Sequence, residues 1–164
     1  MENIINGDTT KQAGKFAIVG VINTLVDVVI LNILVSFGIT AVFMILGQKF
    51  LVANVISVAV AIINSFILNK FWTFQASGEN FYIQIIKFLV ITIIGMFVLH
   101  QLVFNSLYYG LPFISGFAVS ITHFLRLSSI FSDQFVALNF AKAIAIVVSL
   151  VWNFIGYKFI VFKK

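Results

Sequence analysis

The chain has 164 residues, of which 62% are hydrophobic and only 9% charged, with a mean hydropathy of +1.14 and a formal net charge of +5. A chain of this length and composition cannot hide its apolar surface in one soluble core, so a soluble globular domain is excluded and an integral membrane protein is predicted. The chain has no cysteine, which excludes disulfide and thiolate chemistry without fixing the compartment.

Four long apolar segments are expected to cross the membrane as helices. They cover residues 16–37, 50–69, 84–107 and 136–157. The first has 22 residues and one formal charge, which suits a hydrocarbon layer of about 30 Å. It is too long for a cleaved signal and no small-residue cleavage pattern follows, so we expect it to be retained. Residues 111–125 are interrupted by Pro112 and Gly116, so we expect an interfacial or re-entrant segment there.

The basic residues indicate the orientation of the spans, because lysine and arginine favour cytoplasmic connections. Seven of them lie on one side of the predicted spans, namely Lys11, Lys15, Lys70, Lys87, Lys158, Lys163 and Lys164. The other side has Lys49 and Arg126, and Lys142 falls inside the fourth segment. We therefore expect both termini in the cytoplasm. An aromatic belt at the cytoplasmic interface is also expected, formed by Trp72, Tyr82, Tyr157 and neighbouring phenylalanines.

A short pattern occurs twice in the chain. Residues 63–75 read INSFILNKFWTFQ and residues 152–164 read WNFIGYKFIVFKK, and an offset of 88 places Lys70 on Lys158. Each half also opens with a Lys-Phe pair, at Lys15 and at Lys87. Because each half contains two spans, both halves have the same orientation. The sequence thus predicts an all-α bundle of four transmembrane helices, a single membrane domain over 1–164, built from parallel two-helix repeats at about 15–75 and 84–162.

Small and polar residues recur at helical spacing inside the spans. The spacing predicts one small or polar face on each of the four spans. In chain order these faces contain Gly20, Asn23 and Asp27; Asn54, Ser57, Ala61 and Asn64; Thr92, Gly95 and Leu99; and Lys142, Ala145, Ser149, Trp152 and Gly156. These faces are expected to point at one another, because lipid does not solvate polar groups. Two interpretations stay open: interhelical hydrogen bonds that only pack the helices, and a polar interior that suits sugar hydroxyl groups.

Two charged residues lie deep in the predicted spans. Asp27 is 11 residues past Phe16, or about 17 Å along a helix, and Lys142 is 16 residues before Lys158, or about 24 Å. A charge at such depth costs about 3 kcal/mol, so each should be paired or face a hydrated cavity. The alternatives are an internal salt bridge between the two residues and a polar path through the bundle.

One lysine marks the cytoplasmic end of each span. Lys15, Lys70, Lys87 and Lys158 each have an ordinary explanation as topology signals that also attract anionic headgroups. Together they predict a ring of cations that draws in a lipid phosphate.

Three stretches carry a resemblance to a known family. KFAIVGVINTLVDVVILNIL, LVANVISVAVAIINSFILNKFWTF and NFAKAIAIVVSLVWNFIGYKFIVF resemble the GtrA-like family of small four-span bacterial membrane proteins, over Lys15 to Phe162. The second ending has the family's Asn-Phe pair at Asn153, whereas the first reads Ser65-Phe66. The resemblance implies work on polyprenyl-phosphate-linked sugars beside a membrane glycosyltransferase, for glycosylation of cell-surface polysaccharide or teichoic acid at the bacterial cytoplasmic membrane.

We therefore expect a translocator, or flippase, of a polyprenyl-phosphate-linked sugar. The residues expected to contact its phosphate and sugar are Lys15, Asn23, Asp27, Asn54, Asn64, Asn69, Lys70, Lys87, Lys142, Asn153 and Lys158. One alternative is a non-catalytic membrane anchor for the glycosyltransferase, and another is a small cation antiporter that uses Asp27.

Enzymatic activity is not expected. The five acidic residues are Glu2, Asp8, Asp27, Glu79 and Asp133, and no two of them form an Asp-x-Asp metal site. His100 and His123 have no acidic neighbour in sequence, so neither a catalytic triad nor a zinc site is indicated. No cofactor, metal or nucleic acid is expected to bind. We expect the chain to form a homodimer or a larger assembly.

Overall fold

The structure is a computed structural model that describes residues 7–45, 47–77 and 80–163. Two compact units divide the chain at residue 80, and each contains two long apolar helices. Lys164, counted above among the cytoplasmic lysines, and the acidic residues Glu2 and Glu79 lie outside the described residues.

Four helices are long and apolar enough to cross a membrane. They cover Asp8–Ser36, Val52–Thr73, Phe81–Gly110 and Asp133–Val161. The shortest has 22 residues, or about 33 Å, which exceeds a hydrocarbon layer of about 30 Å. The chain is therefore an all-α, multi-pass membrane protein with four spans, as predicted. The third span starts earlier than expected because the Asn80 side chain caps it by accepting a hydrogen bond from the backbone N–H of Tyr82.

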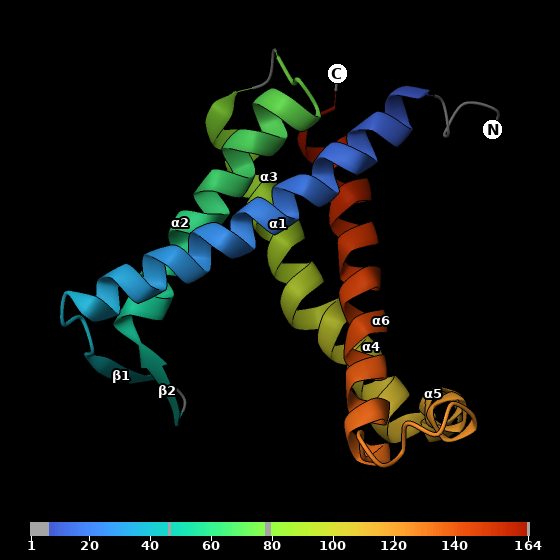
Figure 1. Ribbon diagram of the computed structural model, residues 1–164. Helices are drawn as coiled ribbons and strands as arrows, with labels where there is room; N and C mark the ends of the chain where they lie inside the picture. The colour runs from blue at the N-terminus through green and yellow to red at the C-terminus, as the bar shows by residue number, and fades with distance from the viewer. Residues whose placement is uncertain (1–6, 46, 78–79, 164) are drawn as a thin grey trace. The chain divides into compact units, whose positions relative to one another are not determined.

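The first unit is a pair of long helices that pack against each other, α1 (Gly7–Ser36) and α2 (Val52–Leu68), followed by the π-helix η1 (Asn69–Thr73) (Figure 1). Val19 on α1 and Ala53, Ser57 and Phe66 on α2 are buried. Most of the remaining surface of α1 is aliphatic, which suits contact with lipid. The two helices thus bury residues between them and present aliphatic side chains to the lipid.

A β-hairpin, which was not expected from the sequence, joins α1 to α2. Strands β1 (Val42–Ile45) and β2 (Gln48–Leu51) are antiparallel, and the rings of Phe43 and Phe50 stack at 5.6 Å. Gly47 has a φ of +78° in the turn, a conformation that glycine adopts without steric cost. The second span therefore begins at Val52 and not at residue 50.

The second unit starts with one long helical run, made of α3 (Phe81–Ile93), η2 (Ile94–Leu99), α4 (His100–Asn105) and η3 (Ser106–Gly110). α6 (Asp133–Gly156) packs against this run and ends in η4 (Tyr157–Val161) (Figure 1). The π-helical segments are local widenings of the helix, a feature that often accompanies functional sites.

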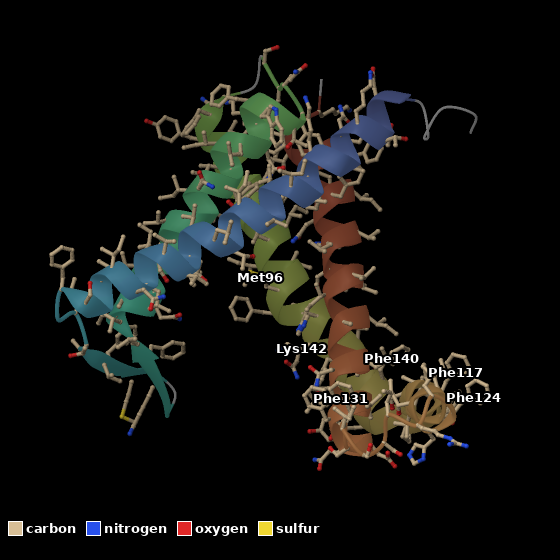
Figure 2. The ribbon with its side chains drawn as sticks, in the orientation of Figure 1. Met96, Phe117, Phe124, Phe131, Phe140 and Lys142 are labelled. Carbon is tan, nitrogen blue, oxygen red and sulfur yellow. The ribbon has the colours of Figure 1, made fainter. Side chains whose placement is uncertain are left out.

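A short helix, α5 (Pro112–Phe124), lies between these two spans and packs against α6. Its 13 residues extend about 20 Å, so it is too short to cross a membrane, as predicted. Phe117 and Phe124 on α5 are 66% and 87% exposed (Figure 2). His123, which has no acidic neighbour in sequence, lies with its Nε2 2.7 Å from Oδ1 of Asp133 at the start of α6.

The repeated sequence pattern has a repeated local conformation. The backbone N–H of Phe74 donates to the carbonyl of Asn69 at 2.9 Å, and that of Phe162 donates to the carbonyl of Tyr157 at 2.8 Å. Both bonds close a π-helix, and both phenylalanines are buried. The larger symmetry between the two halves stays a prediction.

Candidate functional site

Polar side chains of α1 and α2 meet inside the first unit. The Ser57 hydroxyl donates to Oδ1 of Asp27 at 2.5 Å, and Nδ2 of Asn64 donates to Oδ1 of Asn23 at 2.7 Å. These four residues form what we call the first seam. The prediction that these two helix faces point at each other is confirmed. One hydrogen bond joins Asn23 and Asn64, which is the kind of interhelical contact that the packing interpretation requires.

Asp27 keeps unused hydrogen-bonding capacity. Among the described residues, Ser57 is its one hydrogen-bond donor, and Ser57 also lies 3.0 Å from the carbonyl of Asn54. A hydroxyl has a single hydrogen to donate, whereas an ionised carboxylate has about four lone-pair sites. The half-buried Asp27 can therefore accept further hydrogen bonds from water or a polar ligand.

A second seam joins the two spans of the second unit. The Ser149 hydroxyl donates to the carbonyl of Gly95 at 2.7 Å, and Nε1 of Trp152 donates to the carbonyl of Ile91 at 3.1 Å. The hydroxyls of Thr92 and Tyr157 lie 2.7 Å apart. We call these six residues, with Gly156, the second seam.

Glycine permits the close approach of the helices in this seam. A Cβ added to Gly95 would lie 2.6 Å from Oδ1 of Asn153, and one added to Gly156 would lie 2.6 Å from Cγ2 of Ile91. Small residues that bring helix backbones together are the usual interface of membrane helices. The second seam is thus a tightly packed contact.

Several predicted site residues lie outside the two seams. Asn54 and Lys142 are exposed (Figure 2 labels Lys142 on α6). The buried face of α6 runs through Ala141, Ala145 and Ser149, at a spacing of four residues, and Lys142 is about 100° around the helix from Ala141. Lys142 is also three residues before Ala145 and seven before Ser149, or about 60° and about 20° away around the helix. It therefore lies at the exposed edge of this face, and its place in a polar interior stays a prediction.

Two predicted asparagines have buried amide oxygens. Asn69 is fully buried, and its Nδ2 donates to the carbonyl of Ser65 at 2.8 Å. The Oδ1 atoms of Asn69 and Asn153 are both buried and lack a hydrogen-bond partner within the described residues. Buried polar atoms without a partner are rare in folded proteins, and the Oδ1 atom of Asn153 lies in the close contact with Gly95.

The predicted lysines lie against aromatic rings. Nζ of Lys15 donates to the carbonyl of Trp72 at 3.1 Å and lies 5.6 Å from the centre of its ring. Nζ of Lys70 lies 5.6 Å from the ring of Phe71, and Nζ of Lys158 lies 5.4 Å from that of Phe159. These distances are within the range of cation–π attraction. Lys87 is half-buried, and the ring of four lysines stays a prediction.

Both seams and these lysines lie within the part of the chain that matches a known family. The family model described as "GtrA/DPMS, transmembrane domain" matches residues 15–162. The chain belongs to this family. No curated protein matches the chain. Family membership confirms the resemblance read from the sequence and establishes a multi-pass membrane domain.

The predicted aromatic belt of this GtrA/DPMS domain needs one correction. Trp72 and Tyr82 are 37% and 74% exposed, as a belt requires, but Tyr157 is 3% exposed and stacks on Phe88 at 4.4 Å. An aromatic residue beside a lysine at the end of a span is ordinarily interfacial, which explains the error. The repeat contained the missing signal, since Tyr157 aligns with Asn69 and both are buried.

The first unit also contains a polar pocket that the sequence did not predict, which we call the α1 pocket. It has a volume of about 240 Å³ and lies between the start of α1 and the segment that follows α2. Its lining residues are Asp8, Lys11, Gln12, Lys15, Thr73 and Gln75. The spacing of the four residues from α1 places them on one helix face. This pattern was visible in the sequence, but Lys11 and Lys15 were interpreted there as indicators of orientation and phosphate attraction, and not as part of a pocket.

Proposed function

We propose that this protein translocates a polyprenyl-phosphate-linked sugar from the cytoplasmic to the outer leaflet of the bacterial cytoplasmic membrane, without catalysing a reaction. Membership of the GtrA/DPMS family supports this class of substrate. Both termini are then cytoplasmic, and the lipid is supplied by a membrane glycosyltransferase. Its sugar is used outside to glycosylate cell-surface polysaccharide or teichoic acid.

The physical task is to move a phosphate and several hydroxyl groups through hydrocarbon. Removing water from such groups without replacing their hydrogen bonds costs several kcal/mol for each group. A protein lowers this cost by offering polar side chains along the route while the polyprenyl chain remains in lipid.

The observation that carries the proposal is the incomplete bonding of Asp27. Along α1 this residue is about 18 Å from Lys15 and about 14 Å from Ser36, so it lies deep within the span. Its carboxylate accepts a hydrogen bond from Ser57 and has room for others. A carboxylate accepts hydrogen bonds from sugar hydroxyls and repels phosphate, so we assign Asp27 to the sugar and the lysines to the phosphate.

The sequence supplies no energy-coupling motif for this transport. The phosphate-binding pattern G-x-x-x-x-G-K-[ST] does not occur in the chain. Translocation is then downhill, driven by consumption of the sugar on the outer side.

Variants of Asp27 test the proposal. Asp27→Ala should lower export of the sugar to the cell surface by at least about tenfold, the effect of losing a hydrogen bond to a charged group. Asn32 is the matched control, because it is an exposed polar residue of the same helix whose Nδ2 bonds to the carbonyl of Val28. Asn32→Ala should leave export unchanged. Export is measured at matched protein levels, with the partner glycosyltransferase co-purified from the same cells.

A second candidate function is a membrane anchor that holds the glycosyltransferase, as a homodimer or larger assembly. The interhelical hydrogen bond from Nδ2 of Asn64 to Oδ1 of Asn23 favours it, since helix packing alone explains that bond. An anchor predicts that Asp27→Ala reduces folding but not export per folded molecule. If export is lost while the glycosyltransferase still co-purifies, the anchor is excluded; if export is retained, translocation through Asp27 is excluded.

A further inference from the structure

The α1 pocket combines positive charge with a position at the end of two spans. Lys11 and Lys15 line it from α1, and Thr73 is the last residue of the span that starts at Val52. Lys15 likewise lies near the start of the first span. The pocket is therefore placed where the spans meet the membrane surface, the depth at which a lipid carries its phosphate.

Polar groups in this pocket are held in place with bonding capacity to spare. Nζ of Lys15 donates one hydrogen bond to the Trp72 carbonyl, which leaves two of its three N–H donors. Thr73 is 2% exposed, and its Oγ1 has no hydrogen-bond partner within the described part of the chain. Oε1 of Gln12 is likewise buried and unpartnered there. A buried hydroxyl without a partner is costly, so a bound ligand is the natural completion of this site.

The backbone next to Thr73 is also unusual. Gln75 has a φ of +49°, a left-handed conformation that is uncommon for residues other than glycine. This conformation follows the π-helix η1 and accompanies the placement of both Thr73 and Gln75 at the pocket. The backbone N–H of Ala76 donates to the carbonyl of Lys70 at 2.9 Å, so the left-handed residue ends the helix and turns the chain so that Gln75 lines the pocket.

We propose that the α1 pocket binds the phosphate group of a polyprenyl-phosphate lipid, with Lys11 and Lys15 supplying positive charge and Thr73 donating a hydrogen bond. This assignment rests on the proposed function for the source of the phosphate. Lysine is a common phosphate ligand that acts as a point charge, and a charge-assisted hydrogen bond is about twice as strong as a neutral one.

The order of residues along α1 fixes how the lipid lies. Asp8 precedes Lys15 by seven residues, or about 10 Å on the side away from the membrane. Its carboxylate repels phosphate and accepts hydrogen bonds from hydroxyls. Before translocation brings the sugar to Asp27, the sugar therefore extends toward Asp8 while the phosphate lies near Lys15 and Thr73. The polyprenyl chain then continues into the hydrocarbon layer.

Native mass spectrometry of the full chain in detergent tests this assignment through titrations with polyprenyl monophosphate. Lys11→Gln and Thr73→Val should each weaken its binding by about fivefold to tenfold, since each removes one hydrogen-bonding group. Lys11 is exposed, so Lys11→Gln leaves the packing intact, and Thr73→Val retains the side-chain shape. Lys49→Gln, a lysine of strand β2 outside the pocket, should change binding by less than about twofold.

Three further probes identify the source of the phosphate. Polyprenol without phosphate, inorganic phosphate and phosphatidylglycerol should each bind at least about tenfold more weakly than polyprenyl monophosphate. The proposal is overturned if both pocket variants bind like the wild type, or if phosphatidylglycerol or inorganic phosphate binds as tightly.

These measurements distinguish a failure of the pocket assignment from a failure of the proposed translocation. If the variants weaken binding but the wild-type protein moves no lipid between leaflets, the pocket assignment stands and translocation fails. If translocation occurs and neither Lys11→Gln nor Thr73→Val alters binding, translocation stands and the pocket assignment fails.

Discussion

Gly156 is one of two positions in the second seam, with Gly95, that leave no room for a Cβ atom. An alanine Cβ there would lie 2.6 Å from Cγ2, 3.1 Å from Cδ1 and 3.3 Å from Cγ1 of Ile91. Carbon atoms pack best at about 3.5–4.0 Å, so Ile91 or the α6 backbone must move by about 1 Å. Overpacking of this kind costs about 1–3 kcal/mol. Gly156→Ala should therefore lower the ratio of folded to unfolded protein by about 5- to 150-fold.

The free energy of unfolding is measured by titrating the protein in mixed micelles with sodium dodecyl sulfate. In a Trp72→Phe background the fluorescence of Trp152 follows the second seam, because its Nε1 bonds to the carbonyl of Ile91. Gly20→Ala is the matched control, since a Cβ at Gly20 meets nothing within 4 Å, and it should be neutral or stabilising by up to about 1 kcal/mol. In an Ile91→Ala background the cost of Gly156→Ala should fall below about 0.5 kcal/mol. If Gly156→Ala is as harmless as Gly20→Ala, α3 and α6 do not approach each other as closely as described.

Two further predictions concern hydrogen bonds inside the spans. A double-mutant cycle with Asn23→Leu and Asn64→Leu should give a coupling free energy of about 0.6 kcal/mol and no more than about 1.7 kcal/mol in micelle unfolding; additive effects would show that the two amides do not bond. Tyr157→Phe should cost about 1 kcal/mol by removing the bond to Thr92 while keeping the stacking on Phe88. It should cost nothing further in a Thr92→Val background, and an unchanged cost there would refute the bond.

Helical periodicity explains what the sequence could predict. The spacing of Asn23 and Asp27 on one span and of Ser57 and Asn64 on the next identified two faces, and these faces are hydrogen-bonded to each other. Spacing alone did not predict that Lys142 is exposed, because the buried face of α6 is formed by the small residues Ala141, Ala145 and Ser149, and Lys142 lies at its edge.

Other features depend on contacts that no local pattern encodes. The β-hairpin was missed because its apolar residues, such as Phe43 and Phe50, continue directly into the apolar run of α2, and only Gly47 marks the turn. The α1 pocket was missed because Thr73 reaches α1 only through the packing of the two helices. Long-range placement of this kind follows from tertiary structure and not from spacing.

The central claim is that the protein moves a polyprenyl-phosphate-linked sugar between leaflets, and a reconstituted assay measures this directly. Vesicles are prepared with a fluorescent polyprenyl-phosphate sugar, and dithionite, which does not cross the membrane, bleaches the lipid that reaches the outer leaflet. Vesicles containing the wild-type protein should lose inner-leaflet fluorescence faster than protein-free vesicles, and Asp27→Ala should slow this loss relative to Asn32→Ala. Equal rates in wild-type and protein-free vesicles would contradict the account.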